Sequence, residues 1–379
     1  MKVLLLPSWY PNSDNELDGI FFKEQAEALS KRGIEVIVLS INIISLSRIN
    51  KTRLKKGLSV TEENGVKVYR YNTYNYFPRL TELYLRNYAN LIKKLIKKII
   101  KEEGEIGLVH IHSAIDAGIA YSISKIDIPY VITEHSSKYQ RNLLNSVQKK
   151  YLNDVFSNAK DIIAVGLGLK NALAEYTDKD NIKVISNPIS LKKIEVTKEK
   201  DKSRFRFFSL GILTKNKGMD LLIKAFYNNI EKLKQCELYI GGDGPEYTNI
   251  KNMIKEYNLE DNIKLLGKLD REAVAKNMNN CDAFVLASRV ETFGIVFIEA
   301  MIYGKPVIGT RTGGPDTFIN KNNGIIVEVE NVDELGTALV EMYNEATRYN
   351  EDDIIKYCYE NFNEDIICKK IIDVYKTVL

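Results

Sequence analysis

Two glutamates with seven residues between them, Glu291 and Glu299, enclose a Phe-Gly step in the segment "ASRVETFGIVFIEAMIYGKPVIGT" (287–310). The apolar run before them predicts a buried strand, and a helix is predicted from about Gly294 to Gly304. The first turn of a helix binds phosphate well, and carboxylates accept hydrogen bonds from neighbouring sugar hydroxyls. The pattern therefore indicates a ligand with a diphosphate centre and hydroxyl-rich ends, as in a nucleotide sugar. The alternative is that both glutamates are solvated surface residues.

Three more turns of this half carry glycine or lysine after an apolar strand. Lys217 and Gly218 follow "FRFFSLG", "GDGPEY" (242–247) follows "ELYIG", and "TGGPD" (312–316) follows "PVIGT". A lysine in such a turn can meet a diphosphate as a point charge. Each turn alone is most simply solvated, but together they indicate one binding edge.

The N-terminal half offers fewer candidates. Gly19 stands in the turn before the first predicted helix, where it would face a phosphate. Glu134 and His135 directly follow the strand "PYVIT", and His135 is a candidate partner of a donor sugar or, alternatively, a structural histidine. His110 and His112 alternate in "VHIHS", and we expect one of them to be a core residue at the strand end.

Two series of buried strands and helices must position these residues. Continuous apolar runs separated by helices predict parallel sheets covered on both faces. The series pauses at the charged stretch 189–204 and then starts again. We therefore predict an α/β protein with two Rossmann-like, doubly wound domains, 1–190 and 204–360, facing each other across a cleft. Ligands of open parallel sheets bind at the carboxyl ends of the strands.

Composition excludes several classes. The net charge of +4 on 379 residues argues against bulk nucleic-acid binding. Four scattered cysteines and three histidines give no metal-ligand spacing. The opening "MKVLLLPSWYP" is too short an apolar run for a signal peptide, and no run is long enough to span a bilayer. We expect a cytoplasmic protein, at most peripheral on the inner face of the membrane.

Together these motifs resemble the retaining glycosyltransferases of family 4, which have the GT-B architecture of two Rossmann-like domains. The likeness is strongest over 208–330, where "GILTKNKG", "GGDGPE", "IKLLGKL", "ETFGIVFIEAM", "GKPVIGT" and "NGIIV" follow the family's order. The stretches "PSWYPN", "DGIFFKEQAEALSKRG" and "YVITEHSS" are similar to the branch that builds bacterial polysaccharides. The resemblance also implies a C-terminal helix, about 362–379, that packs back on the first domain.

The resemblance implies transfer of a sugar from a nucleotide diphosphate, foremost a UDP-sugar, to a saccharide or lipid-linked saccharide. The anomeric configuration would be retained, in the synthesis of a cell-surface polysaccharide or glycan. Its implied catalytic residues are His135 on the sugar, Lys217 on the leaving diphosphate and Glu291 on a sugar hydroxyl. Its implied donor-binding residues are Gly19, Gly211, Lys217, Leu266 at the base, Glu291, Phe293, Gly294, Ile295 and Glu299 at the ribose.

One position departs from the family. An arginine often follows the glycine of the "G-x-L" motif, where it shares the diphosphate with the lysine, but here that position is Ile212. Lys215 is a candidate substitute. Neither a cofactor nor a metal is expected, because the one D-x-D, "DKD" at 178–180, lies in a polar connector. No acid is evident as a nucleophile, so the resemblance implies same-face displacement in which the leaving phosphate accepts the proton.

The segment 86–101, "RNYANLIKKLIKKIIK", carries six basic residues and no acid. Its apolar residues form one stripe and its lysines the other face, as in a helix packed on the sheet with a solvated face. The alternative is peripheral contact with anionic lipid headgroups, with the tyrosine-rich stretch 71–84 helping to seat a lipid-linked acceptor.

Three other functions remain as alternatives. A Rossmann oxidoreductase needs G-x-G-x-x-G after its first strand, where it is lacking, and the partial "GLGLKN" (166–171) follows a later strand without a third glycine. A hydrolysing nucleotide-sugar epimerase would share the donor site but release UDP without an acceptor. Because Ile212 replaces the family's arginine, a non-catalytic sugar-nucleotide-binding scaffold is also an alternative. The sugar, base, acceptor, linkage and oligomeric state do not follow from the sequence.

Overall fold

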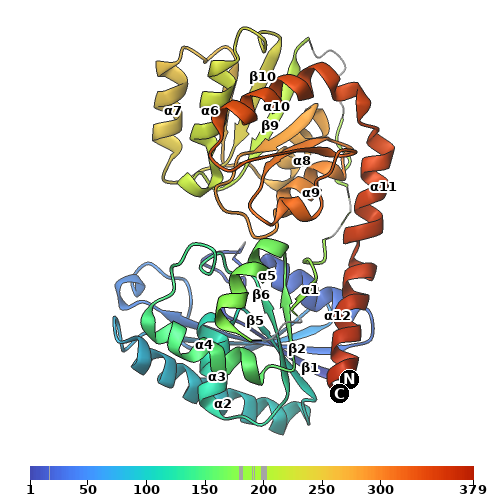
Figure 1. The fold of residues 1–379 in the computed structure, drawn as a ribbon. Coiled ribbons are helices and arrows are strands. Elements are labelled where there is room, and N and C mark those ends of the chain that lie inside the picture. The colour runs from blue at the N-terminus through green and yellow to red at the C-terminus, as the bar shows by residue number, and fades with distance from the viewer. Residues whose placement is uncertain (17, 179–181, 190, 192, 198–202) are drawn as a thin grey trace. The chain divides into compact units, whose positions relative to one another are not determined.

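The computed structural model describes residues 1–16, 18–178, 182–189, 191, 193–197 and 203–379. The chain forms two compact units (Figure 1). The first comprises Met1–Val165, Leu169–Ser190 and Glu364–Leu379, and the second comprises Gly166–Gly168 and Leu191–Asn363. Each is an α/β layered unit built on one sheet.

The first unit holds an eight-stranded sheet of order β3-β4-β2-β1-β5-β6-β7-β8. Its strands are β1 (Lys2–Pro7), β2 (Glu35–Ile44), β3 (Gly57–Glu63), β4 (Val66–Tyr74), β5 (Leu108–His112), β6 (Tyr130–Glu134), β7 (Asp161–Ala164) and β8 (Lys183–Val184). Its helices are α1 (Ile20–Ser30), α2 (Thr81–Glu103), α3 (Ile119–Ser124), α4 (Ser146–Asn158), α12 (Glu364–Val378) and, from Leu169 on, α5 (Leu167–Leu173). Figure 1 shows α2, α3 and α4 on one side of the sheet and α1 and α12 on the other, which explains the continuous apolar strands.

One edge of this sheet differs from the parallel arrangement that the apolar runs predict. Strand β3 pairs antiparallel with β4 through a tight turn at Asn64 and Gly65, both with positive φ (50° and 80°). Asn-Gly is the preferred pair for such a hairpin turn, so the signal was present in the sequence. Strand β4 contains the first part of the tyrosine-rich stretch 71–84, because Tyr71 to Tyr74 lie in this strand beside β2.

The second unit holds a six-stranded, fully parallel sheet of order β11-β10-β9-β12-β13-β14. Its strands are β9 (Phe205–Leu210), β10 (Cys236–Gly241), β11 (Ile263–Gly267), β12 (Ala283–Leu286), β13 (Val307–Thr310) and β14 (Gly324–Val327). Its helices are α6 (Met219–Asn228), α7 (Tyr247–Glu256), α8 (Arg271–Asn280), α9 (Ile295–Met301), α10 (Val332–Glu345) and α11 (Glu351–Phe362). In Figure 1, α6, α7 and α10 cover one face and α8, α9 and α11 the other.

The helix predicted from Gly294 to Gly304 is shorter in the structure. Helix α9 spans Ile295–Met301, and the chain reaches Gly304, with φ of 75°, through a turn. Glycine suits this position because a left-handed backbone strains other residues.

The C-terminal helix α12 belongs to the core of the first unit. Ile367, Ile371 and Tyr375 are buried in one apolar cluster with residues of β1, α1 and β2. At its start, the Arg32 guanidinium donates two hydrogen bonds to one carboxylate oxygen of Asp365, at 3.1 and 2.5 Å.

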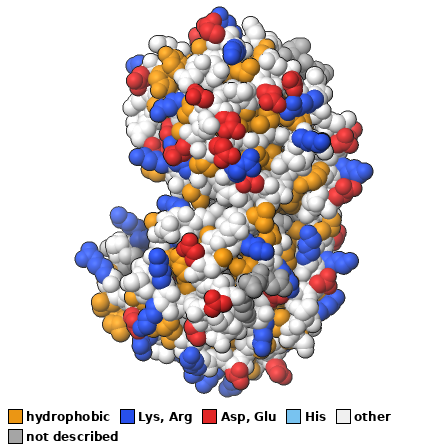
Figure 2. Space-filling model, viewed as in Figure 1, with side chains coloured by type: hydrophobic (Ala, Val, Ile, Leu, Met, Phe, Trp, Pro, Cys, Tyr) orange, Lys and Arg blue, Asp and Glu red, His pale blue; other side chains and the backbone are white. Residues whose placement is uncertain are grey.

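The apolar stripe of helix α2 packs inside the first unit. Its buried residues are Leu85, Tyr88, Ala89, Ile92, Leu95, Ile96 and Ile99. Its exposed basic residues are Arg86, Lys93, Lys94, Lys97, Lys98 and Lys101. Figure 2 shows Lys and Arg side chains along the lower edge of the molecule, over α2 in Figure 1. Among the residues that the structure describes, no helix combines the length and apolar character needed to cross a bilayer.

Candidate functional site

The turn after β9 and the turn after β12 meet through one ion pair in the second unit. Lys217 closes a short 3-10 turn, and its Nζ lies 2.6 Å from Glu291 Oε2. The two side chains are 25% and 13% exposed, so the pair is partly shielded yet within reach of a ligand. Because parallel strands end at the same sheet edge, two motifs far apart in sequence form one charged site.

Glycines bring these turns close together. Gly218 has φ of 63°, and a Cβ there would lie 1.8 Å from the Ala287 carbonyl oxygen at the end of β12. The stem of Lys217 crosses Gly211, where a Cβ would lie 3.5 Å from Lys217 Cδ. Close backbone approach therefore requires glycine at 218, whereas a Cβ at 211 would make only an ordinary contact with the lysine stem.

A clamp that the sequence analysis missed holds the same turns. Arg289 donates two hydrogen bonds of 2.9 Å to the two carboxylate oxygens of Asp220, one of 2.8 Å to Glu330 and one of 2.6 Å to the carbonyl oxygen of Lys215. Its backbone N–H donates to the carbonyl oxygen of Asn216 at 2.7 Å. The hydrogen bond to Asp220 raises the pKa of Arg289. An arginine two residues before Glu291 was the available signal, but its partners are not adjacent in sequence.

The predicted donor-binding residues of α9 and the turn before it lie together. Gly294 has φ of 94°, and a Cβ on it would lie 3.3 Å from Glu291 Cγ. Glu299 lies one turn of α9 beyond Ile295, and burial raises the pKa of its carboxyl, an effect that Arg271 partly offsets. Phe293 is buried and packs edge-on against Phe318.

Leu266, Ile212 and Lys215 are further positions of the second unit that the sequence singles out. Leu266 lies half-buried near the end of β11, at the same sheet edge. Ile212, in place of the family's arginine, is 68% exposed and contributes nothing to the core. Lys215, the candidate substitute, is exposed on the turn that Arg289 holds.

Glu134 organises the strand ends of the first unit. Its buried carboxylate accepts hydrogen bonds from the backbone N–H groups of Ala114 (2.8 Å), His135 (2.9 Å) and Ser136 (2.9 Å), and from the Tyr139 hydroxyl (2.9 Å). These donors fix the loops after β5 and β6. Glu134 is therefore a positioning residue for His135.

The three histidines form one buried cluster beside this carboxylate. His110 and His112 are fully buried and His135 is 8% exposed. The prediction that one of the alternating pair lies in the core is confirmed, and the second is buried as well. Burial lowers the pKa of His110 and of His135 to about 3 and that of His112 well below its usual value. All three rings are therefore neutral near pH 7.

Gly19 caps α1 in the same unit. It has φ of 71°, and a Cβ there would lie 2.9 Å from both Phe22 Cδ2 and Trp9 Cδ1. Backbone conformation and packing alone therefore require glycine here, whether or not a phosphate binds.

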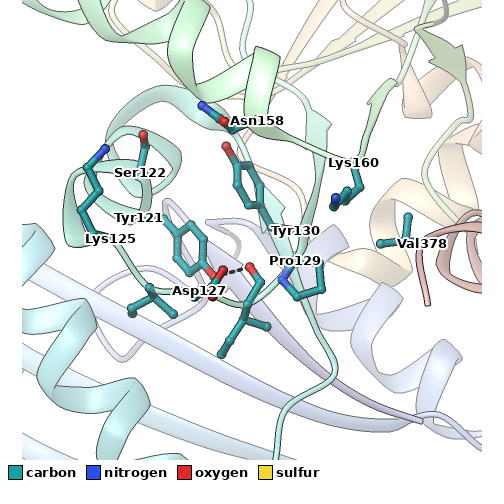
Figure 3. Close-up of a pocket in the computed structure, with 11 residues that line it drawn as sticks. Tyr121, Ser122, Lys125, Asp127, Pro129, Tyr130, Asn158, Lys160 and Val378 are labelled. Atoms are coloured by element: carbon teal, nitrogen blue, oxygen red, sulfur yellow. Dashed lines mark hydrogen bonds between the residues drawn. The ribbon is translucent and has the colours of Figure 1, made fainter.

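Two cavities lie away from the predicted site residues. One of about 590 Å³ includes Pro129 and Tyr130, at the start of β6 and therefore opposite the strand end that carries His135 (Figure 3). The hydroxyl of Tyr121 in its wall already donates to the Ile128 carbonyl oxygen at 2.8 Å, as drawn in Figure 3. The other, of about 750 Å³, includes Asn320 and Asn323, whose amides donate to the Phe318 carbonyl oxygen. Among the described residues, none of the buried side-chain polar atoms that lack a hydrogen-bond partner lies in either lining.

No group of three or more His, Cys, Asp or Glu side chains in the described part of the chain is arranged to hold a metal ion. Of the "DKD" stretch, residues 179 and 180 lie outside the described residues.

Comparison with known proteins agrees with this fold. The family model for glycosyl transferases group 1 matches residues 192–360, and that for glycosyltransferase family 4 matches residues 19–193. An uncharacterized glycosyltransferase of Methanocaldococcus jannaschii is 34% identical over 255 residues, covering 66% of this chain and 69% of its own. One from Haemophilus influenzae is 26% identical over 358 residues, covering 93% of both chains.

Solved structures agree as well. Sucrose-phosphate synthase from Thermosynechococcus elongatus superposes with a TM-score of 0.79 at 19% identity, over 100% of this chain and 99% of its own. Anabaena HepE, solved in complex with UDP and glucose, superposes with a TM-score of 0.70 at 19% identity over all of both chains. The chain belongs to the family 4 glycosyltransferases with the GT-B fold, and it is a glycosyltransferase.

Proposed function

We propose that this glycosyltransferase moves a sugar from a UDP-sugar to a saccharide or lipid-linked saccharide, with retention and without a metal. The observation that carries the proposal is the Lys217–Glu291 pair, 2.6 Å long, on a glycine-shaped sheet edge. The complex of HepE with UDP and glucose supports the choice of nucleotide, although that likeness is one of fold.

In the proposed reaction, the bond from the anomeric carbon to the diphosphate oxygen breaks and its electron pair stays on the phosphate. The Lys217 ammonium turns from Glu291 to that oxygen, a form of electrostatic stabilisation that dominates many enzymes. Glu291 is then free to accept a hydrogen bond from a sugar hydroxyl, and Glu299 accepts those of the ribose. The acceptor hydroxyl attacks from the same face, and its proton passes to the leaving phosphate.

We propose that His135 binds the donor sugar and that Gly19 lies at the phosphates. Phe293, Gly294 and Ile295 would present backbone to the sugar and diphosphate, and Leu266 would meet the base. The support for these assignments is their position at strand ends and helix starts, where parallel sheets bind ligands.

A ligand screen tests the donor assignment. UDP-, GDP- and ADP-sugars are compared by thermal shift, and turnover is followed with and without a mixture of saccharide acceptors. We expect UDP-sugars to raise the melting temperature and product to form only with an acceptor. Release of UDP without an acceptor would indicate an epimerase, and binding without turnover would indicate a scaffold. The anomeric configuration of the product, read by NMR, tests retention.

We also propose peripheral contact with anionic lipid through α2. Its apolar stripe is buried, so the contact would be electrostatic and confined to the exposed lysines. Exposed Leu80 (54%) and Leu83 (45%) at its start would add a small apolar contribution.

Vesicle flotation tests this contact. We expect binding to anionic vesicles at low salt, release at high salt, and loss in a Lys93→Ala/Lys97→Ala variant. The matched control is Lys251→Ala/Lys255→Ala, which removes two exposed lysines from α7. Equal flotation of both variants, or no flotation of the wild type, would contradict the proposal.

A cell-surface polysaccharide pathway agrees with a Bacillus subtilis relative provisionally assigned to teichuronic acid biosynthesis, which is 24% identical over 401 residues.

A further inference from the structure

His135 carries a polar atom that the rest of the described chain does not satisfy. Its ring is 8% exposed, and its Nδ1 has no hydrogen-bond partner among the residues that the structure describes. A buried polar atom without a partner costs about 1–3 kcal/mol, so such atoms mark positions that water or a ligand completes. Whether this atom donates or accepts decides what it can bind.

The other ring nitrogen of His135 belongs to a chain of contacts. His135 Nε2 lies 3.2 Å from His112 Nδ1, and His112 Nε2 lies 3.5 Å from the amide nitrogen of Gln25. An amide NH₂ can only donate, so His112 Nε2 accepts from Gln25. A neutral imidazole carries one proton, so that of His112 is on Nδ1 and donates to His135 Nε2. The proton of His135 is therefore on Nδ1.

The surroundings keep these rings neutral and in place. Burial lowers the pKa of His135 to about 3 and that of His112 well below its ordinary value. The Phe22 ring packs against both imidazoles, with centroids 4.9 Å from His112 and 4.8 Å from His135. Gln25 is itself 1% exposed. The donor–acceptor order is thus set inside the unit, before any ligand arrives.

We propose that Gln25 and His112 are positioning residues that hold His135 with its proton on Nδ1, so that it presents a hydrogen-bond donor. The matching ligand group is an accepting oxygen, such as a sugar hydroxyl or carboxylate, and an ammonium group is rejected. The assignment of that oxygen to the donor sugar rests on the proposed function above. The order of protons along Gln25, His112 and His135 does not.

His110 provides a matched control within the same cluster. Its Nδ1 lies 2.6 Å from the Tyr375 hydroxyl and its Nε2 lies 2.7 Å from Thr133 Oγ1. It meets His112 by ring contact, with centroids 4.2 Å apart. Tyr375→Phe therefore perturbs a neighbouring buried histidine without entering the chain from Gln25 to His135.

The test is NMR of the full-length protein with ¹⁵N-labelled histidine. The chain has three histidines, so single replacements assign every ring. We expect His135 and His112 of the wild type to be protonated on Nδ1. Gln25→Met, which removes the amide donor, should give a mixture of the two protonated forms at His135, and Tyr375→Phe should leave His135 unchanged.

Protonation of His135 on Nε2 in the wild type would overturn the proposal without any variant, and so would an unchanged His135 in Gln25→Met. Titration with UDP-glucose separates the two proposals. If neither UDP-glucose nor any other UDP-sugar of the ligand screen binds while the wild-type protonation is as expected, the donor assignment fails and the proton order stands. If one of them binds and turns over, Gln25→Met should lower kcat/KM roughly five-fold, the equivalent of one hydrogen bond, and Tyr375→Phe should lower it less than two-fold.

Discussion

Arg289 and Asp220 are joined by two parallel hydrogen bonds of 2.9 Å each, between the loop after β12 and the start of α6. Both residues are partly buried, and Arg289 also donates to the carbonyl oxygen of Lys215 in the turn that carries Lys217. The position of Lys217 therefore depends on a residue outside the predicted donor-binding set.

Lysine cannot reproduce this clamp, because its ammonium lacks the planar fork of arginine. We expect Arg289→Lys to lower the melting temperature by about 3–6 °C through loss of charge-assisted hydrogen bonds. Turnover should also fall, because the Lys217 turn is held less firmly. The matched control is Arg311→Lys, whose ion pair with Glu328 is half-exposed and should change neither quantity measurably. Equal effects of the two substitutions would show that Arg289 has no special role.

Removal of Lys217 tests the charge proposed for the leaving diphosphate. We expect Lys217→Ala to lower kcat by about 10²–10³-fold, as loss of one electrostatic stabiliser does in other enzymes. Lys224→Ala, an exposed lysine of α6, is the control and should keep wild-type turnover. Turnover is measured by UDP release with acceptor present.

Glu291→Gln tests the partner of that lysine. It keeps the size of the side chain but removes the charge, so we expect weaker binding of the donor sugar and lower turnover. If Glu291→Gln and Lys217→Ala both kept full turnover, the site would be assigned wrongly.

The fold and the charged edge of the second unit were predictable because their signals are local. Apolar strand runs indicate buried parallel strands, and a glycine or charged residue after each run indicates a binding edge. That logic placed Lys217 and Glu291 at one edge, although not their direct pairing. The Arg289 clamp was not predictable, because nothing in the sequence distinguishes its partners Asp220 and Glu330 from ordinary exposed acids.

The first unit shows the same limit. Gln25, His112 and His135 come from α1, β5 and the loop after β6, and only the sheet order brings them together. The hairpin at Asn64 and Gly65, by contrast, had a clear local signal in its dipeptide.

A pair of glycine substitutions separates backbone strain from steric conflict. Gly33 and Gly218 both have positive φ, 81° and 63°, but a Cβ on Gly33 meets nothing within 4 Å. We expect Gly33→Ala to destabilise by about 1–2 kcal/mol, the usual strain of a left-handed alanine.

Gly218→Ala adds a Cβ 1.8 Å from the Ala287 carbonyl oxygen, so the Lys217 turn must move away from β12. We expect a loss above about 4 kcal/mol, and turnover should fall in whatever folded protein remains. Calorimetric melting of both variants measures the difference. Similar melting temperatures for the two would contradict the close approach of these loops.

The neutral histidine cluster makes the first unit sensitive to acid. The folded pKa of His110 is about 3, whereas an unfolded histidine has a pKa near 6.5, so between these values the unfolded chain binds more protons. Above the unfolded pKa the ring is neutral in both states, and the folded state carries no penalty. As pH falls toward the folded pKa, the free energy of unfolding decreases. For His110 this loss is about 2 kcal/mol between pH 7 and pH 5.

His110→Gln removes this titration but keeps a polar side chain beside Tyr375 and Thr133. We expect the variant to lose about 2 kcal/mol less than the wild type on acidification to pH 5. The neighbours add to this difference, because, besides burial, His110 lowers the pKa of His112 and of His135, and its removal relaxes that effect. Urea unfolding followed by tryptophan fluorescence measures this in the right unit, since Trp9 is the chain's one tryptophan and packs on Phe22. Parallel loss of stability in both proteins would mean that His110 is already protonated, or solvated, in the folded state.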